Sequence, residues 1–228
     1  MTYRTSDLFT YLETHLQSRI PGSRLEKTQL PQARELSLYL INEDYLRNGL
    51  TREQAEALMD NPPYWGFCWA SGQVLGRCVL DNPDRVKGKT LLDFGAGSGV
   101  VGIAAKMAGA KRVILCDLDE KALQAGELNA RINGVNVDFS AAIDEHLEED
   151  VSNWMITVAD VFYDRDNLPL LETMLDRFVT VLVSDSRLKG QPLPGMDIIG
   201  DSDSHKVPDL DESREFNSVT LYRSRQNR

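Results

Sequence analysis

The fold of this chain is decided by one stretch, Thr90-Leu91-Leu92-Asp93-Phe94-Gly95-Ala96-Gly97-Ser98-Gly99, in which a short buried strand runs into a glycine-rich turn. Glycines at alternate positions let the backbone turn sharply, because no Cβ stands in the way. The small and apolar residues from Val100 to Ala108 predict a helix, and Val113-Ile114-Leu115-Cys116-Asp117 predicts a second strand. Strand, turn, helix and strand in this order predict a nucleoside-binding βαβ unit, whose helix N-terminus faces the ligand.

Two carboxylates of this unit indicate which nucleoside it binds. Asp117 ends the second strand, where a carboxylate can accept hydrogen bonds from ribose hydroxyls. A dinucleotide fingerprint needs glycine where this chain has Val100, which disfavours a nicotinamide dehydrogenase. Asp93, just before the turn, would repel a pyrophosphate but suits a ligand with an amino group and a sulfonium cation.

The spacing Asp-x-Gly-x-Gly-x-Gly therefore resembles the first motif of class I S-adenosylmethionine-dependent methyltransferases. We expect S-adenosyl-L-methionine as the cofactor and S-adenosyl-L-homocysteine as its product. The expected cofactor contacts from this unit are Asp93, Gly95, Gly97, Gly99 and Asp117.

Composition limits the classes of function. The chain has 228 residues, of which 42% are hydrophobic, and a net charge of -10. This suffices for one domain with an extension, and the acidic balance argues against unaided nucleic-acid binding. No apolar run is long enough to span a bilayer, and the N-terminus lacks a signal pattern. Scattered cysteines and histidines predict no metal site and a cytoplasmic, reducing location.

Residues 1–62 predict an N-terminal helix and strand extension, and residues 63–228 the main domain. The extension should contain a helix from Ser6 to Ser18 with Ser6 as its cap, and a strand from Glu35 to Ile41 paired with Arg24 to Leu30. A capping box at Thr51 predicts a further helix, which runs to about Asp60.

Strands alternate with helices in the main domain. Helices are expected over 72–80, 120–133 and 168–176, and further strands over 135–141, 155–159, 178–183 and 218–223, with a strand start at 197–200. The charge run 145–150 should form a solvated face or a loop. The alternation predicts an α/β fold with a mostly parallel sheet, helices on both faces, and an antiparallel pair at the C-terminal edge.

A second informative stretch is the aromatic segment, Pro63-Tyr64-Trp65-Gly66-Phe67-Cys68-Trp69-Ala70-Ser71-Gly72-Gln73. We expect Tyr64 and Phe67 to pack in the core. Trp65 and Trp69 are better candidates for the wall of a cofactor or substrate site, because an indole face attracts cations. Gly72 would let the backbone approach a ligand closely.

The strand 155–159 ends in Asp160-Val161-Phe162-Tyr163-Asp164, beside the first strand of the unit. Asp160 could hold a substrate ammonium and take its proton, and the ring and hydroxyl of Tyr163 could orient the amine. These two residues are the candidate catalytic pair, and Asp160 also borders the methyl-donor position. The alternative is that Asp160 only caps the strand and Tyr163 only packs.

Together, the aromatic segment, the glycine turn and the Asp160–Asp164 segment resemble the seven-β-strand protein-lysine methyltransferases. The similar group contains the electron-transfer-flavoprotein β-subunit lysine methyltransferase and its nicotinamide N-methyltransferase-like bacterial relatives. The resemblance covers about residues 60 to 185. It implies a Rossmann-like class I fold with a seven-stranded sheet. It also implies that Trp69, Gly72, the glycine turn and Asp117 line the cofactor, and that Asp160 and Tyr163 face the target amine.

Related enzymes often carry Asn/Asp-Pro-Pro-Tyr after the fourth strand, where this chain has Asp-Val-Phe-Tyr. The acceptor is therefore open. The leading hypothesis is a monomeric enzyme that methylates a protein lysine, with the electron transfer flavoprotein β subunit as a candidate substrate. A small-amine or ribosomal-protein methyltransferase and a non-catalytic cofactor-binding scaffold are the alternatives.

Overall fold

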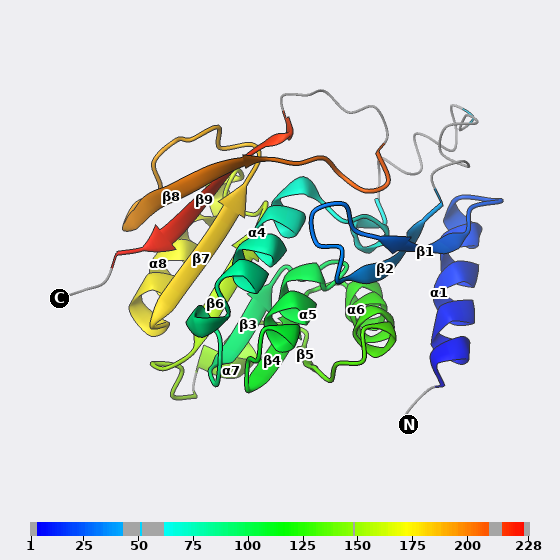
Figure 1. Ribbon diagram of the computed structural model, residues 1–228, viewed down its shortest axis with the longest axis horizontal. Coiled ribbons are helices and arrows are strands. Elements are labelled where there is room, and N and C mark those ends of the chain that lie inside the picture. Colours follow the sequence, from blue (N-terminus) through cyan, green and yellow to red (C-terminus); the bar gives the residue numbers. More distant parts are fainter. Residues whose placement is uncertain (1–3, 43–50, 52–61, 148, 210–215, 226–228) are drawn as a thin grey trace.

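The computed structural model describes residues 4–42, 51, 62–147, 149–209 and 216–225. Within them, a sheet of seven strands has the order β5-β4-β3-β6-β7-β9-β8, and β1 and β2 form a separate pair (Figure 1). The strands are β1 (Leu25–Gln29), β2 (Ser37–Ile41), β3 (Thr90–Phe94), β4 (Arg112–Cys116), β5 (Asp138–Ser140), β6 (Met155–Ala159), β7 (Thr180–Asp185), β8 (Met196–Asp203) and β9 (Ser218–Ser224).

The helices lie between these strands along the chain. The α-helices are α1 (Thr5–Arg19), α4 (Ala70–Asp81), α5 (Val100–Met107), α6 (Glu120–Ile132), α7 (Asp144–Leu147) and α8 (Leu168–Arg177). Short 3-10 helices are η1 (Tyr64–Gly66), η2 (Pro83–Arg85) and η3 (Arg165–Asn167). Within the described residues, no helix is both long and apolar enough to cross a lipid bilayer.

The sheet is parallel from β5 to β7, and β9 runs antiparallel to both β7 and β8. This confirms the predicted mostly parallel sheet with an antiparallel C-terminal edge. Parallel neighbours need crossover connections, which α5, α6 and α8 supply. Because β3 lies in the middle beside β4 and β6, the ends of these three strands meet at one edge of the sheet.

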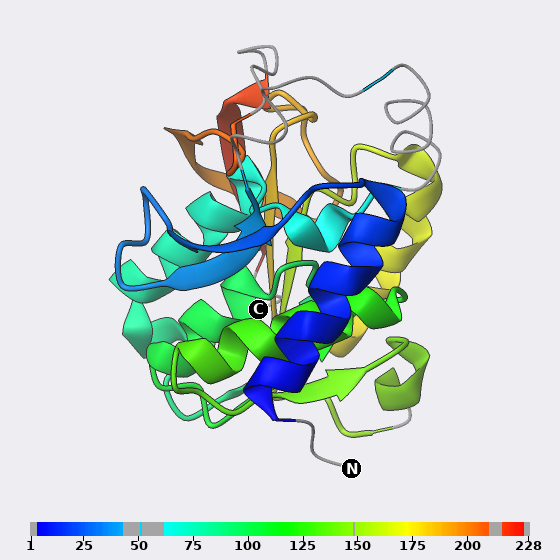
Figure 2. The same ribbon diagram turned by 90° about the vertical axis from the view of Figure 1, so that its right-hand side faces the viewer.

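Helices cover both faces of the sheet, as predicted. Neighbouring residues of a strand point to opposite faces. Leu91 of β3 packs in a buried cluster with α4 and α5 residues, whereas Leu92 packs in another cluster with α8 residues. Figure 2 shows the strands between α4 on one side and α8 on the other.

The N-terminal extension packs against α6. Leu8, Leu12 and Leu16 form one buried stripe of α1 and share a cluster with apolar residues of α6 and the aromatic segment. The predicted hairpin is confirmed, because β1 and β2 pair antiparallel with Leu25 opposite Ile41. Strand β2 is also tied to α6, since the Tyr39 N–H donates to Asn129 Oδ1 at 2.7 Å.

Several local predictions were wrong. Ser6 does not cap α1: the helix already begins at Thr5, and the Ser6 hydroxyl donates to Asp7. The charge run 145–150, by contrast, is solvated as expected: α7 includes part of it, and Glu145, Glu149 and Asp150 are exposed. Strand β5 is only three residues long, and β7 ends two residues later than predicted, at Asp185. The helix predicted from Thr51 to Asp60 lies largely outside the described residues.

Candidate functional site

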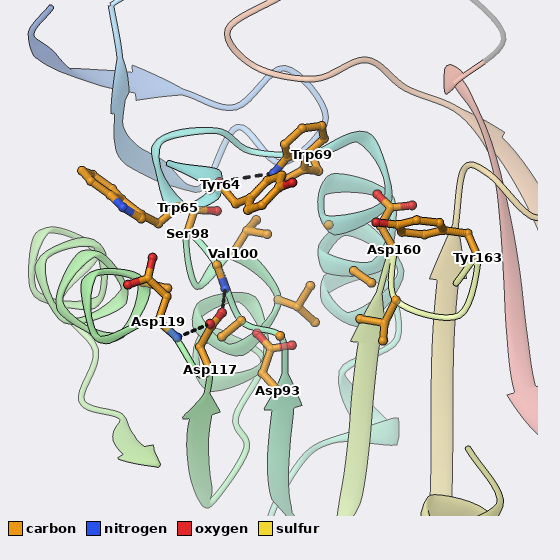
Figure 3. Close-up of a pocket in the computed structure, with 18 of the residues that line it drawn as sticks. Tyr64, Trp65, Trp69, Asp93, Ser98, Val100, Asp117, Asp119, Asp160 and Tyr163 are labelled. Atoms are coloured by element: carbon orange, nitrogen blue, oxygen red, sulfur yellow. Dashed lines mark hydrogen bonds between the residues drawn. The ribbon is translucent and has the colours of Figure 1, made fainter. Parts of the chain in front are cut away.

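A cavity of about 260 Å³ lies at the carboxyl ends of β3, β4 and β6, where open parallel sheets bind ligands. Figure 3 shows Asp117 and Asp93 above the ends of β4 and β3, with Tyr64 and Trp69 across from them and Asp160 and Tyr163 at the β6 side. The cavity is lined by Tyr64, Trp65, Trp69, Gly72, Asp93, Gly95, Ala96, Gly97, Ser98, Val100, Val101, Asp117, Asp119, Ala122, Ala159, Asp160, Val161, Tyr163 and Arg187.

The glycine turn needs its glycines for different reasons. Gly95, Gly97 and Gly99 all have positive φ, which favours glycine. A Cβ on Gly97 would point into open space, with its nearest neighbour, the Gly95 carbonyl oxygen, 3.9 Å away. A Cβ on Gly99 would instead lie 3.1 Å from Leu115 and 3.2 Å from Gly126 of α6. Gly95 and Gly97 thus border the cavity, whereas Gly99 allows α6 to pack and does not line it.

Asp117 holds the glycine turn in place. Its Oδ2 accepts the Gly97 N–H at 2.9 Å, and its Oδ1 accepts the Asp119 N–H at 3.0 Å. Burial raises the pKa of this half-buried carboxyl. Each carboxylate oxygen has a second lone pair, so Asp117 can still accept hydrogen bonds from ligand hydroxyls.

Asp93 forms the floor of the cavity and is only 2% exposed. Its Oδ2 accepts the N–H of Gly102 in the first turn of α5 at 2.8 Å, and its Oδ1 accepts the Thr157 hydroxyl of β6 at 2.9 Å. Burial raises its pKa to about 7, and the charge of Asp117 adds to the shift. Because the side chain is almost fully buried beneath the cavity, Asp93 can act on a ligand mainly through its charge.

The aromatic segment forms the opposite wall. Trp65 and Trp69 line the cavity, and the Trp69 indole N–H donates to the Tyr64 carbonyl at 3.2 Å. Phe67 is buried as expected. The prediction of a core position for Tyr64 was wrong, because its side chain is 57% exposed and also lines the cavity.

Gly72, in the first turn of α4, lies where α4 packs closely against α5. A Cβ there would lie 2.9 Å from Val100 Cγ1, so the glycine is needed for helix packing as well as for the shape of the cavity. The residue before it, Ser71, is fully buried and turns its hydroxyl toward Asp160.

Asp160 is held by three donors. Its Oδ1 accepts the Ser71 hydroxyl at 2.7 Å, the Ser186 N–H at 2.9 Å and the Ser186 hydroxyl at 3.0 Å. Its φ of 51° is unusual for a residue with a Cβ. Such strain is often found at functional sites, where the surrounding structure holds the residue in place.

Tyr163 lies three residues on and is 44% exposed. The guanidinium of Arg187 stands over its ring, 4.5 Å from the ring centroid. Asp164 instead accepts the Asp166 N–H as the cap of η3 and does not line the cavity.

The cavity is strongly acidic. Four carboxylates line it in the described part of the chain, those of Asp93, Asp117, Asp119 and Asp160, against one guanidinium, that of Arg187. A cationic ligand is therefore favoured. Of the residues predicted for the site, only Gly99 lies outside the lining. Sequence reasoning assigned no role to Ser71, Asp119, Ser186 or Arg187. Ser71 lies inside the recognised aromatic segment, but nothing in the sequence sets it apart there, and the other three lie outside the recognised motifs.

Comparisons with known proteins show which family the chain is similar to. A family model described as ribosomal protein L11 methyltransferase (PrmA) matches residues 78–166. The electron transfer flavoprotein beta subunit lysine methyltransferase of Homo sapiens is 42% identical over 115 residues, which are 50% of this chain and 44% of that protein. The homolog of that enzyme in Caenorhabditis elegans is 32% identical over 170 residues, with 66% of this chain and 68% of that protein covered.

A solved structure from Streptococcus mutans, described as a SAM-dependent methyltransferase, superposes with a TM-score of 0.53 at 9% identity. It covers 98% of this chain and 82% of that one, and this likeness confirms the class I methyltransferase fold alone.

The chain spans about half the length of the first mammalian relatives, 44–49%. It covers more than two thirds of the nematode relative at 32% identity. The chain therefore belongs to the electron transfer flavoprotein β-subunit lysine methyltransferase family.

Proposed function

We propose that this chain binds S-adenosyl-L-methionine in the described cavity and transfers its methyl group to a lysine side chain of a protein. The proposal is carried by one observation: the glycine turn with Asp117 and the corner made by Asp160 and Tyr163 border the same acidic cavity. Because the chain is a family member, the electron transfer flavoprotein β subunit is the first substrate to test.

The residues fit this cofactor. The open space over Gly97 gives room for a ligand against the backbone, and Asp117 beside it can accept hydrogen bonds from ribose hydroxyls. The acidic lining favours a sulfonium cation, and Trp69 forms part of the wall around it. When bound, the cofactor supplies an activated methyl group.

The Asp160–Tyr163 corner would then prepare the acceptor. A lysine ammonium must lose a proton before its nitrogen can act as a nucleophile. All three hydrogen bonds that fix the Asp160 carboxylate end on Oδ1. We assign Oδ2 the role of holding the ammonium and receiving its proton. The exposed ring of Tyr163 would orient the amine.

A ribosomal-protein acceptor is not favoured by a specific observation. The match to the L11 methyltransferase model spans residues 78–166, from the end of α4 to the Asp160–Asp164 segment. It leaves out the aromatic segment and all the residues after 166. We retain a reducing cytoplasmic location and a monomeric state as parts of the proposal.

The test is transfer of a labelled methyl group from S-adenosylmethionine to purified electron transfer flavoprotein and to a lysate from cells that lack this chain. We expect a labelled lysine in a protein, mapped by mass spectrometry, and its loss in Asp160→Asn. Asp164→Asn is the matched control, because this carboxylate caps η3 outside the cavity. Label confined to small molecules would contradict the protein acceptor, and cofactor binding without any transfer would indicate a scaffold.

A further inference from the structure

Asp185 is a buried carboxylate close to the proposed catalytic corner. It ends β7, is 0% exposed and does not line the cavity. Ala159 of β6 pairs with Ser184 of β7. Asp160, the residue after β6, and Asp185, the last residue of β7, therefore lie next to each other at the ends of adjacent strands. No motif in the sequence includes Asp185.

The carboxylate of Asp185 closes a turn over residues 185–188, the β7 turn. Its Oδ1 accepts the N–H of Arg187 at 2.7 Å and the N–H of Leu188 at 2.8 Å. An aspartate that accepts backbone N–H groups two and three residues ahead fixes a tight turn.

This turn supplies contacts to both residues of the catalytic corner. Ser186 donates its N–H and its hydroxyl to Asp160 Oδ1. Arg187 places its guanidinium over the ring of Tyr163, and the ring of Phe216 lies 5.4 Å from the same group. One carboxylate thus orders two neighbours of the site without touching the cavity.

A carboxylate in this place is costly. Its Oδ2 is buried without a hydrogen-bond partner, and burial together with the charge of Asp160 raises the pKa of Asp185 to about 6. The ionisable groups that act on it are Asp160 at the end of β6 and Tyr222 on β9, and the backbone N–H groups of Arg187, Leu188 and Tyr163 lower its pKa. Buried groups that lack a partner call for a specific explanation.

We propose that Asp185 is a positioning residue for methyl transfer, which holds the β7 turn so that Ser186 fixes Asp160 and Arg187 stacks on Tyr163. The inference rests on the proposed roles of Asp160 and Tyr163, because Asp185 acts only through them. It accounts for an acidic residue at the end of β7 that makes no contact with the cavity.

The first test measures turnover and product binding in Asp185→Ala and Asp185→Asn. Asp185→Ala should lower kcat about tenfold or more while the Kd for S-adenosylhomocysteine changes less than about twofold. Asp185→Asn should recover most of kcat, because the amide oxygen can accept the same two N–H groups. Asp150→Ala is the control, since Asp150 also accepts a backbone N–H two residues ahead, that of Ser152, but lies in an exposed turn outside the cavity.

A double-mutant cycle then tests the route of the effect. If Asp185 acts through Ser186, Asp185→Ala should cost much less kcat in a Ser186→Ala background than in the wild type. Additive losses would contradict this route. An Asp185→Ala variant with wild-type kcat, in a protein that loses activity on Asp160→Asn, would overturn the inference and leave the proposed function standing.

Hydrogen exchange supplies a readout that needs no methyl acceptor. In Asp185→Ala, amide exchange should accelerate in peptides over 186–188 and also over 160–163, and Asp185→Asn should stay near the wild type. Faster exchange at 186–188 with unchanged exchange at 160–163 would refute the link to Asp160 and Tyr163. An inactive wild type that shows the predicted exchange pattern would count against the proposed function alone.

Discussion

Replacing Asp93 by asparagine should stabilise the folded chain, and the gain should grow with pH. Asparagine has nearly the same shape, its oxygen can accept the Gly102 N–H, and its amide can donate to the Thr157 hydroxyl oxygen. The substitution therefore removes a buried charge while keeping the hydrogen bonds that join α5, β3 and β6.

The pH dependence follows from the pKa of Asp93, which is raised from 3.8 to about 7. The folded state binds this proton more tightly than the unfolded state. The associated stability is fully present below pH 3.8 and is lost as the pH rises through 7. At about 1.36 kcal/mol per pKa unit, the loss between pH 5.5 and 8.5 is roughly 2 kcal/mol, and the variant does not suffer it.

Urea unfolding followed by tryptophan fluorescence at these two pH values measures the effect. The difference in unfolding free energy between Asp93→Asn and the wild type should be roughly 2 kcal/mol larger at pH 8.5. Asp150→Asn is the control, because Asp150 is exposed and its pKa is lowered by its hydrogen bonds to Ser152. If the difference in unfolding free energy between Asp93→Asn and the wild type is the same at both pH values, the raised pKa assigned to the buried Asp93 carboxyl is wrong.

Further predictions concern binding, catalysis and packing. Asp93→Asn should weaken S-adenosylmethionine more than S-adenosylhomocysteine in calorimetry, because only the former carries the sulfonium charge; equal losses would contradict an electrostatic role. Asp117→Ala should weaken S-adenosylhomocysteine by about 1–2 kcal/mol, the scale of lost charge-assisted hydrogen bonds, with circular dichroism unchanged. Asp160→Ala should lower kcat far more than cofactor affinity, and a parallel loss of both would argue against its role with the amine. Leu12→Ala should lower the unfolding free energy by about 2–5 kcal/mol, because the Leu12 side chain of α1 is fully buried in the cluster shared with α6. A loss under about 1 kcal/mol would show that α1 is not firmly packed against α6.

The sequence predicted the parts of the fold that depend on local pattern. The βαβ unit was recognised because buried strands, glycines and a small-residue helix follow one another within 28 residues, from Thr90 to Asp117. The end of β6 was placed correctly as well, since an apolar run stops abruptly at Asp160. These signals placed Asp117 and Asp160 at the same edge of the sheet.

Side-chain direction in irregular segments was harder to predict. Tyr64 begins the 3-10 helix η1, and such a turn has no apolar period from which exposure can be read. The roles of Gly97 and Gly99 differ only because α6 packs against the latter, which is a tertiary contact. Asp185 was missed because the end of β7 lies two residues beyond the apolar run, and its partners are backbone groups rather than a motif.

The central claim is that the space over Gly97 holds the cofactor, and titration calorimetry with S-adenosylhomocysteine tests it most directly. The matched pair is Gly97→Val and Gly134→Val, since both glycines have positive φ but Gly134 has nothing within 4 Å of an added Cβ and lies outside the cavity. We expect one ligand bound per chain in the wild type and in Gly134→Val, and none in Gly97→Val at a comparable thermal midpoint. A wild type that binds no S-adenosylhomocysteine, or a folded Gly97→Val that binds it as the wild type does, would contradict the account.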